Sequence, residues 1–427
     1  MIGNRSTSLL ATSIAFLAIT ILLTSTAFAT TGYFSLGQGT GNIAMGGAGV
    51  AFPLESLSAT YNPASAAFLP AGYSVGIALF SPDRSYTVTG KPSGFPGTFG
   101  LTPGKVTSKS KYFPMPSVGM NFRLDNASAV NISLVSHGGM NTDYRTDTFY
   151  GSGGHTGVDL AQAFVYVAYS RKIAEKHSLG VSGIVAYQRF KATGLQAFSP
   201  FSSNPAHLTN NGYDSSHGFG FKVGYLGYIT PDLSIGASYA PKITMSRFKK
   251  YSGLFAEGGK FDVPSVVAVG LAYSPVKTLT IASDYKRIHY TDAHSVGNPL
   301  LPNLMTALLG ADGGAGFGWR DINVYKIGMQ YQPGHDWIWR LGFSTNDQPI
   351  PDSEVLFNIL APGVIEHHYT AGFSKVLGGS RARVNFAVMY APTATVRGAN
   401  PLEAPGQQRI DLKLGEWQAE VSYSVGF

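Results

Sequence analysis

Two adjacent side chains, Trp319 and Arg320, have the chemistry to bind an amphipathic anion. The guanidinium of an arginine presents a planar fork of N–H donors that matches a carboxylate, and a neighbouring aromatic ring offers an apolar wall to an alkyl chain. The pair follows an apolar stretch, residues 298–310, and precedes a strand-like segment, residues 321–332. We therefore predict that Arg320 holds a ligand carboxylate at the end of the fold where this apolar stretch meets the strand. The alternative is that Arg320 pairs with Asp321 or with an interfacial headgroup.

A second group of candidates lies near the N-terminus. Tyr33 and Phe34 are predicted to contact an apolar ligand. Asn62, Pro63 and Ala64 are predicted to form a rigid turn, because proline fixes φ at about −65° and an asparagine side chain can bond to nearby backbone. An ordinary surface turn is the alternative for these three residues.

Motifs for catalysis, cofactors or metals are weak in this sequence. The run from Gly39 to Ala44 resembles the glycine-rich motif of dinucleotide-binding folds. That motif follows a strand, whereas this run follows a predicted signal peptide, residues 1–29. His367 and His368 are adjacent, so on a strand they face opposite ways and make a poor metal pair. No Ser/His/Asp set converges by motif. We predict no metal site, no cofactor and no enzymatic activity; a barrel enzyme such as a lipase remains an alternative.

Residues 1–29 are predicted to be a secretory signal peptide rather than a single membrane-spanning helix. Arg5 precedes an apolar stretch, residues 9–23, and Ala27-Phe28-Ala29 matches a cleavage site. Beyond this segment the sequence has no run of about 20 apolar residues, the length that a membrane-spanning helix needs.

Composition narrows the fold class of the exported chain. Only 13% of the residues are charged, against about 25% in ordinary globular proteins. Glycine is frequent, with 52 residues, and so are tyrosine and phenylalanine, with 23 and 26. This combination predicts an all-β protein, an outer-membrane β-barrel; a secreted β-sandwich or β-helix is the alternative. The net charge of +7 is spread along the chain without basic runs among aromatics, which argues against a nucleic acid partner.

Alternation of apolar with small or polar residues marks the strands. At the C-terminus, Trp417, Val421, Tyr423 and Phe427 share one face of a strand. Six short turns alternate with seven long loops, which predicts a fourteen-stranded antiparallel transmembrane barrel with both chain ends on one side. The predicted loops are 85–114, 137–158, 191–215, 246–262, 291–320, 346–365 and 393–413.

The stretch from Gly32 to Leu69 fits neither a strand nor a linker. It is rich in glycine, it contains apolar residues throughout, and Glu55 is its only acidic or basic side chain. Such a segment cannot build its own core, and it is too apolar for a solvated linker. We predict that it fills the lumen of the barrel.

Two blocks of the sequence carry a family resemblance. The first comprises Gly32-Tyr33, the glycine-rich run and the Asn62-Pro63-Ala64 turn; the second is residues 317–351, in which an aromatic–base–Asp triplet precedes two strands and a closing Pro-x-Pro. Both are similar to the FadL-type long-chain fatty acid transporters of Gram-negative outer membranes. The resemblance implies a fourteen-stranded barrel, an internal hatch, and passive uptake of hydrophobic compounds by a lateral route.

The predicted organisation is a signal peptide (1–29), an N-terminal hatch or plug (30–71) and a transmembrane β-barrel (72–427). The predicted function is passive uptake of long-chain fatty acids or similar lipophilic molecules across the bacterial outer membrane. Aromatic or alkane hydrocarbons are alternative ligands, and a polar-solute porin or a structural barrel is an alternative function. The expected partners are the hydrophobic ligand and outer-membrane lipid, and the chain is expected to act as a monomer.

Overall fold

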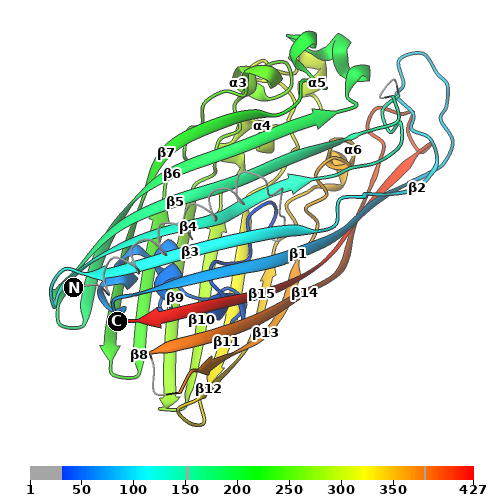
Figure 1. Cartoon of the computed structure of the whole chain (residues 1–427). Helices are drawn as coiled ribbons and strands as arrows, with labels where there is room; N and C mark the ends of the chain where they lie inside the picture. Colours follow the sequence, from blue (N-terminus) through cyan, green and yellow to red (C-terminus); the bar gives the residue numbers. More distant parts are fainter. Residues whose placement is uncertain (1–30, 151–152, 379–380) are drawn as a thin grey trace.

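Antiparallel strands form one closed sheet in the computed structural model, which describes residues 31–150, 153–378 and 381–427. Sequence neighbours from β3 to β15 pair with one another, β3 pairs with β1, and β15 pairs with β1 to close the ring (Figure 1). The wall of this described part has fourteen strands, as the turn pattern predicts. The predicted signal peptide lies outside the described residues.

The wall strands are long and the helices are short. The strands are β1 Gly72–Thr89, β2 Gly104–Thr107, β3 Phe113–Arg123, β4 Ser128–Asn141, β5 Gly157–Ala174, β6 His177–Thr193, β7 Asp214–Thr230, β8 Leu233–Ala240, β9 Val266–Val276, β10 Leu279–Ile288, β11 Ile322–Tyr331, β12 Trp337–Asn346, β13 His367–Val376, β14 Ala382–Ala399 and β15 Arg409–Gly426. The helices are α2 Thr40–Ile43, η1 Ser56–Thr60, η2 Pro63–Ala67, η3 Gln196–Phe201, η4 Pro205–His207, η5 Lys249–Tyr251, α3 Ala256–Gly259, η6 Tyr290–Asp292, α4 His294–Gly297, α5 Asn303–Thr306, η7 Asp352–Glu354 and α6 Val355–Asn358. In the described residues, none of these helices has the length and apolar character needed to cross a membrane.

Four of the predicted loops are too wide, namely 85–114, 137–158, 191–215 and 393–413, and the loop predicted at 246–262 is too narrow because β8 ends at Ala240. The loops expected at 85–114 and 393–413 begin later and end earlier than predicted, because β1 continues to Thr89 and pairs there with Arg409 of β15. The short strand β2 adds to the same end of β1. Continued pairing satisfies backbone groups that a loop would leave to water, so the wall extends well beyond the apolar band.

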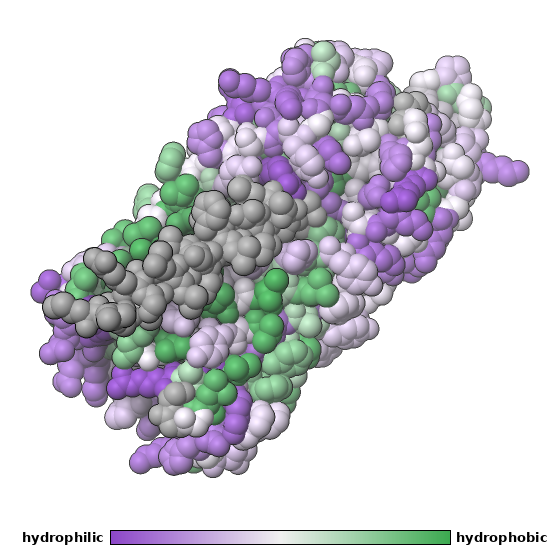
Figure 2. Space-filling view, in the orientation of Figure 1, coloured by the Kyte–Doolittle hydropathy of each residue, from purple (hydrophilic) through white to green (hydrophobic). Residues whose placement is uncertain are grey.

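Side chains alternate between the two faces of the wall as predicted. On β15, Trp417 and Tyr423 are exposed on the outside, whereas Glu416, Gln418 and Glu420 are buried on the inside. Hydrophobic residues gather around the middle of the barrel surface and hydrophilic residues gather toward its two ends (Figure 2). An apolar belt between polar ends is the surface that a membrane-spanning barrel requires.

Candidate functional site

The N-terminal segment (residues 31–71) lies within the ring of strands, where side chains of the wall bind its backbone (Figure 1). The Asp284 carboxylate on β10 accepts the N–H groups of Gly49 and Val50, at 2.7 and 3.1 Å. The Lys326 ammonium on β11 donates to the carbonyl oxygens of Leu36 and Gly47, at 2.6 and 3.2 Å. Charged groups of the wall therefore satisfy backbone groups of a segment that has little regular structure.

On another part of the ring, a neutral side chain of β13 binds the backbone of the same segment. The Thr370 hydroxyl on β13 donates to the carbonyl of Ala44 at 3.0 Å and accepts the N–H of Gly46 at 2.8 Å. Gly46 has a φ of 69°, and a Cβ atom there would lie 2.8 Å from the carbonyl oxygen of Phe343. Glycine is needed at this position because the segment's backbone touches the wall's backbone directly.

The predicted turn at Asn62, Pro63 and Ala64 is buried rather than at the surface. The Asn62 side chain caps η2 by accepting the N–H of Ala64 at 3.1 Å. Its amide donates to the carbonyls of Val50 and Tyr225, at 2.9 and 2.7 Å, and so joins two parts of the N-terminal segment to β7. The surface-turn alternative is thus wrong, and a role of the turn in ligand passage stays a prediction.

A cavity of about 100 Å³, here called the inner cavity, lies between the N-terminal segment and the wall from β4 to β11. Most of its lining is apolar or aromatic. These lining residues are Phe34, Leu36, Val50, Tyr61, Phe164, Tyr166, Ile184, Ala240, Pro241, Ile243, Val263, Pro264, Val266 and Ala268. Its charged lining residues are Lys222, Lys286, Lys326 and Asp284, so basic groups outnumber acidic ones.

The three lysines of the inner cavity differ in their partners. Lys326 is bound to the N-terminal segment, and the Lys222 ammonium donates to the carbonyl of Thr60 at 2.5 Å. Lys286 has no hydrogen-bond or ion-pair partner among the described residues; its Nζ atom lies 5.3 Å from the centre of the Phe34 ring. A positive charge beside an aromatic face, in an apolar space, has the chemistry to bind an anionic group that carries an apolar tail.

Aromatic rings separate the inner cavity from the long loops. Tyr33 lies 5.8 Å from Trp319, 5.2 Å from Tyr290 and 5.7 Å from Phe261, measured between ring centres. The structure therefore brings together Tyr33 and Trp319, which are 286 positions apart in the sequence. Both rings are almost fully buried, and of the sequence-predicted contact residues only Phe34 lines the inner cavity.

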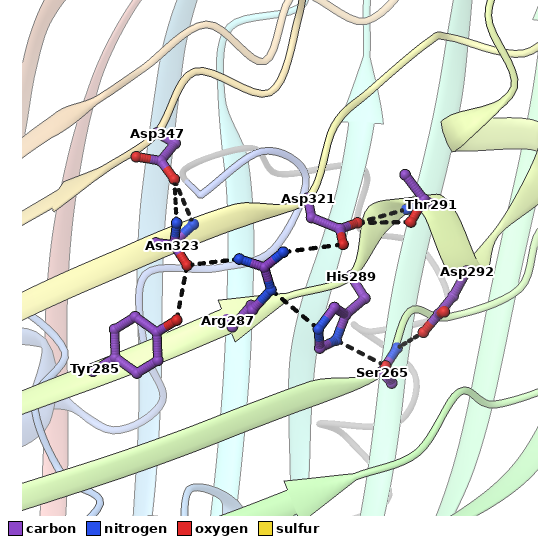
Figure 3. A network of polar contacts seen from close by, with 9 residues as sticks. All are labelled: Ser265, Tyr285, Arg287, His289, Thr291, Asp292, Asp321, Asn323 and Asp347. Atoms are coloured by element: carbon purple, nitrogen blue, oxygen red, sulfur yellow. Dashed lines mark hydrogen bonds and ion pairs between the residues drawn. The ribbon is translucent and has the colours of Figure 1, made fainter.

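Arg320 is exposed and does not line the inner cavity. The alternative, a pairing of Arg320 with Asp321, is not seen in the described residues: Asp321 accepts hydrogen bonds from Thr291, at 2.8 Å to the hydroxyl, and its carboxylate lies 3.5 Å from Arg287. Figure 3 shows this network; Arg287 also donates to Asn323 at 3.0 Å. Arg320 lies near enough to Glu354 to attract its carboxylate, and a role of Arg320 in binding a ligand stays a prediction.

The long-loop end of the lumen is filled by residues 352–365, here called the outer segment. Its apolar side chains are buried, among them Leu356, Ile359 and Val364. Glu354 accepts the N–H of Leu300 at 2.8 Å, and burial raises the pKa of its carboxyl. Asn358 accepts a hydrogen bond of 2.6 Å from the Trp319 indole, which ties the outer segment to the aromatic cluster.

A second apolar cavity of about 30 Å³, the outer cavity, lies under the loops. Its lining is almost entirely apolar, and it includes Phe190, Phe198, Phe255, Phe317, Phe357 and Leu360. The order from the loop end inward is therefore apolar loops, aromatic cluster, and then the inner cavity with its lysines.

Sequence reasoning missed Asp284, Lys286, Lys326 and Lys222. The signal was present on the segment Asp284-Tyr285-Lys286-Arg287, where charged residues fall on both faces of a strand. A charge that faces inward in an otherwise apolar lumen is costly unless it has a partner or a ligand. The assignment of each charge to a face depends on the strand's register, which the sequence does not give directly.

Comparisons with known proteins agree with this architecture. The family model described as outer membrane protein transport protein (OMPP1/FadL/TodX) matches residues 18–390. The toluene transporter TodX of Pseudomonas putida has 18% identity and a TM-score of 0.64, with 92% of this chain and 99% of that chain covered. The toluene transporter TbuX of Ralstonia pickettii has 19% identity and a TM-score of 0.62, with the same coverage.

A FadL homologue from Pseudomonas aeruginosa has 14% identity and a TM-score of 0.66, with 93% of this chain and 100% of that chain covered. No curated protein matches the sequence. At these identities the solved structures show a common fold, whereas the family model covers most of the sequence. The chain therefore belongs to the OMPP1/FadL/TodX family of outer membrane transport proteins.

Proposed function

We propose that this protein takes up hydrophobic compounds with an anionic head, of which long-chain fatty acids are the simplest, across the bacterial outer membrane. The observation that carries the proposal is the Lys286 ammonium, which faces an apolar cavity and lacks a partner among the described residues. A carboxylate would supply that partner, and the alkyl chain would extend along the apolar lining. One chain closes the complete ring, so we propose that a monomer suffices for transport.

The energies favour this class of ligand. Each buried methylene contributes about 0.8 kcal/mol, so an alkyl chain provides most of the driving force. A hydrogen bond to a charged group adds about 1.5–3 kcal/mol. The lysine thus contributes selectivity for the acid, and the apolar lining contributes most of the affinity.

Aromatic hydrocarbons are the second candidate ligands, because rings dominate part of the inner cavity. Phe34, Tyr61, Phe164 and Tyr166 line it, and its volume of about 100 Å³ suits a small molecule better than a whole lipid. The solved structures named as toluene transporters have the same fold. A neutral ring would gain less from Lys286 than a carboxylate would, because a cation attracts a ring face more weakly than it attracts an anion, and this difference separates the two candidates.

The test compares ligands that differ only in charge. Lys286→Met should weaken binding of oleate to the purified protein by roughly tenfold to a hundredfold, the range that a charge-assisted hydrogen bond gives. Binding of oleyl alcohol and of toluene should stay unchanged, and Lys286→Arg should restore most of the oleate affinity. Equal losses for oleate and oleyl alcohol would instead mean that Lys286 has a structural role and would favour the hydrocarbon alternative.

A further inference from the structure

A cluster of basic side chains surrounds Tyr213 at the loop ends of β6 and β7, which lie side by side in the wall (Figure 1). The guanidinium carbon of Arg189 lies 4.3 Å from the centre of the Tyr213 ring, and Lys191 Nζ lies 5.0 Å from it. Lys250, from the connection between β8 and β9, donates to the Tyr213 carbonyl at 2.9 Å. These four residues are here called the outer basic cluster.

The alternation of β6 places the cluster on the outer face of the wall. Val185 is exposed on that face, and Arg189 and Lys191 continue the same face at even spacing. Phe190, which lies between the two basic residues, is buried and lines the outer cavity. The cluster therefore faces the surroundings of the barrel and not the space in which a transported ligand would lie.

The cluster lies where the outer face of β6 leaves the hydrocarbon of the membrane. Leu179 is the first exposed apolar residue of β6, counted from the short turn that precedes it. A tilted strand crosses the hydrocarbon in about 9–11 residues, so a crossing that begins at Leu179 ends near Arg189. On the neighbouring strand, the exposed Phe219 pairs with Val185, whereas the polar Ser215 pairs with Arg189. The basic groups are therefore level with the headgroups of the outer leaflet.

Two carboxylates lie beside the cluster, and neutral donors bind both of them. Asp159, opposite Lys191 in the ladder, is buried and accepts the Tyr213 hydroxyl at 2.6 Å. Asp214 accepts the backbone N–H of Lys250 at 2.8 Å. Three basic groups against two carboxylates leave the cluster positive. Since Asp159 is buried, the accessible side of the cluster is mainly basic.

The Tyr213 ring gives the cluster a fixed geometry. A cation is attracted to the face of an aromatic ring, and Arg189 and Lys191 both lie within reach of this one ring. The Tyr213 hydroxyl is in turn held by Asp159. Two basic groups held near one ring lose less freedom on binding an anion than isolated surface lysines would.

Position and charge together indicate the ligand. The outer leaflet of a bacterial outer membrane is rich in lipopolysaccharide, whose lipid A carries phosphate groups on a disaccharide above its acyl chains. Arginine and lysine bind phosphate oxygens through charge-assisted hydrogen bonds, and basic groups at a membrane surface bind anionic headgroups. We propose that the outer basic cluster binds a phosphate group of lipid A, whose acyl chains lie along the apolar face around Val185 and Phe219. This inference does not depend on the proposed function.

Binding of lipid A to the purified protein in detergent tests the proposal. The test variant replaces the three basic groups of the cluster by glutamine, as Arg189→Gln/Lys191→Gln/Lys250→Gln. The matched control removes three positive charges at exposed positions in the connection from β1 to β3, as Lys91→Gln/Lys105→Gln/Lys109→Gln. Each protein is titrated with bisphosphorylated lipid A, with the same lipid after enzymatic removal of its phosphates, and with inorganic phosphate.

We expect the test variant to bind bisphosphorylated lipid A at least roughly tenfold more weakly than the unmodified protein does. The control should stay within about twofold, and removal of the phosphates should weaken binding to the unmodified protein by at least roughly tenfold. Oleate binding of the test variant should be unchanged, because the cluster faces away from the lumen. The proposed function and this inference can therefore fail separately.

Three results would overturn the site. Equal losses in the two triple variants would mean that charge attracts lipid A without a defined site. Equal affinity for the lipid with and without phosphates would mean that the acyl chains alone carry the binding. Displacement of lipid A by inorganic phosphate at a comparable concentration would mean that the cluster binds a soluble anion instead.

A single neutral substitution tests the geometry and covers a triple variant that does not fold. Tyr213→Leu keeps all three positive charges but removes the ring and the bond to Asp159, so affinity for lipid A should fall about two- to fivefold. Tyr213→Phe keeps the ring and should lose less. Unchanged affinity in Tyr213→Leu would show that the charges act without the geometry of the cluster, and would contradict the proposal.

Discussion

The N-terminal segment and the outer segment both fill the lumen, but charged side chains of the wall bind the backbone of the first, whereas neutral side chains such as Asn346 bind that of the second. The N-terminal segment contributes backbone groups, and wall side chains such as Asp284 and Lys326 bind them. The outer segment contributes apolar side chains, such as Leu356 and Ile359, which pack against the loops and the aromatic cluster, and its backbone carbonyls accept hydrogen bonds from neutral side chains such as Tyr144. Hydrogen bonds to charged groups hold a segment more firmly than apolar packing with neutral hydrogen bonds, so the outer segment can rearrange more readily to admit an apolar ligand.

We infer from this difference that the two segments have different roles. The N-terminal segment forms a fixed floor for the inner cavity, and the outer segment forms an apolar entrance above it. Glycine is frequent in the floor because close backbone approach to the wall excludes larger residues, as at Gly46. The predictions below test this contrast in order of expected effect.

Removal of the floor should have the largest effect. Deletion of residues 32–69 should raise ion conductance in a planar bilayer from closed-channel levels toward open-pore levels, because the outer segment lies at the long-loop end of the lumen and does not take the place of the tethered segment. A deletion confined to residues 355–361 of the outer segment is the control and should raise conductance far less. If the variant without residues 32–69 conducts no better than the unmodified protein, the N-terminal segment does not close the lumen.

A single tether should have a smaller effect of the same kind. Asp284→Ala removes the acceptor for the N–H groups of Gly49 and Val50. Two hydrogen bonds to a charged group are lost, each of about 1.5–3 kcal/mol, so we expect brief conductance bursts and faster proteolysis within residues 31–71. Asp284→Asn keeps one acceptor oxygen and should show a milder change. If Asp284→Ala shows neither conductance bursts nor faster proteolysis, the hydrogen bonds of Asp284 are not needed to hold the N-terminal segment in place.

The buried turn should affect transport more than assembly. Asn62→Ala removes the bonds to Val50 and Tyr225 and leaves the Tyr225 carbonyl of β7 without this donor, at a cost of about 1–3 kcal/mol. Oleate uptake should fall several-fold while heat-modifiable mobility of the barrel stays normal. Thr102→Ala, at an exposed loop position, serves as the control for expression and purification. Normal uptake at normal surface abundance would remove the turn from the transport route.

Substitution of Arg320 should have the smallest effect on the equilibrium affinity for oleate. Arg320 is exposed and lies outside the inner cavity, so solvent screens its attraction for a carboxylate, as at other surface sites worth about 0–1 kcal/mol. Arg320→Ala should therefore slow oleate capture by cells at low oleate concentration and change the affinity of the purified protein about twofold or less. A loss of tenfold or more in affinity would place the anchor at Arg320 instead of Lys286.

The wall was predictable from the sequence because lipid imposes the same two-residue period on every strand. The alternation at Trp417 and Tyr423 therefore identified both the strand and its outer face. The inner cavity was not predictable in this way. Its charged groups come from three strands, Lys222 from β7, Asp284 and Lys286 from β10 and Lys326 from β11, and their meeting depends on register and on tertiary contacts. Trp319 and Arg320 show the limit clearly: one is buried and its neighbour is exposed.

The position of a bound fatty acid tests the central claim most directly. A crystal structure of the protein with a fatty acid that carries bromine on its alkyl chain would locate both the head and the chain. The account predicts a carboxylate within hydrogen-bond distance of Lys286 Nζ, with the bromine signal along the apolar lining of the inner cavity. A carboxylate at Arg320, or ligand confined to the outer cavity, would contradict it.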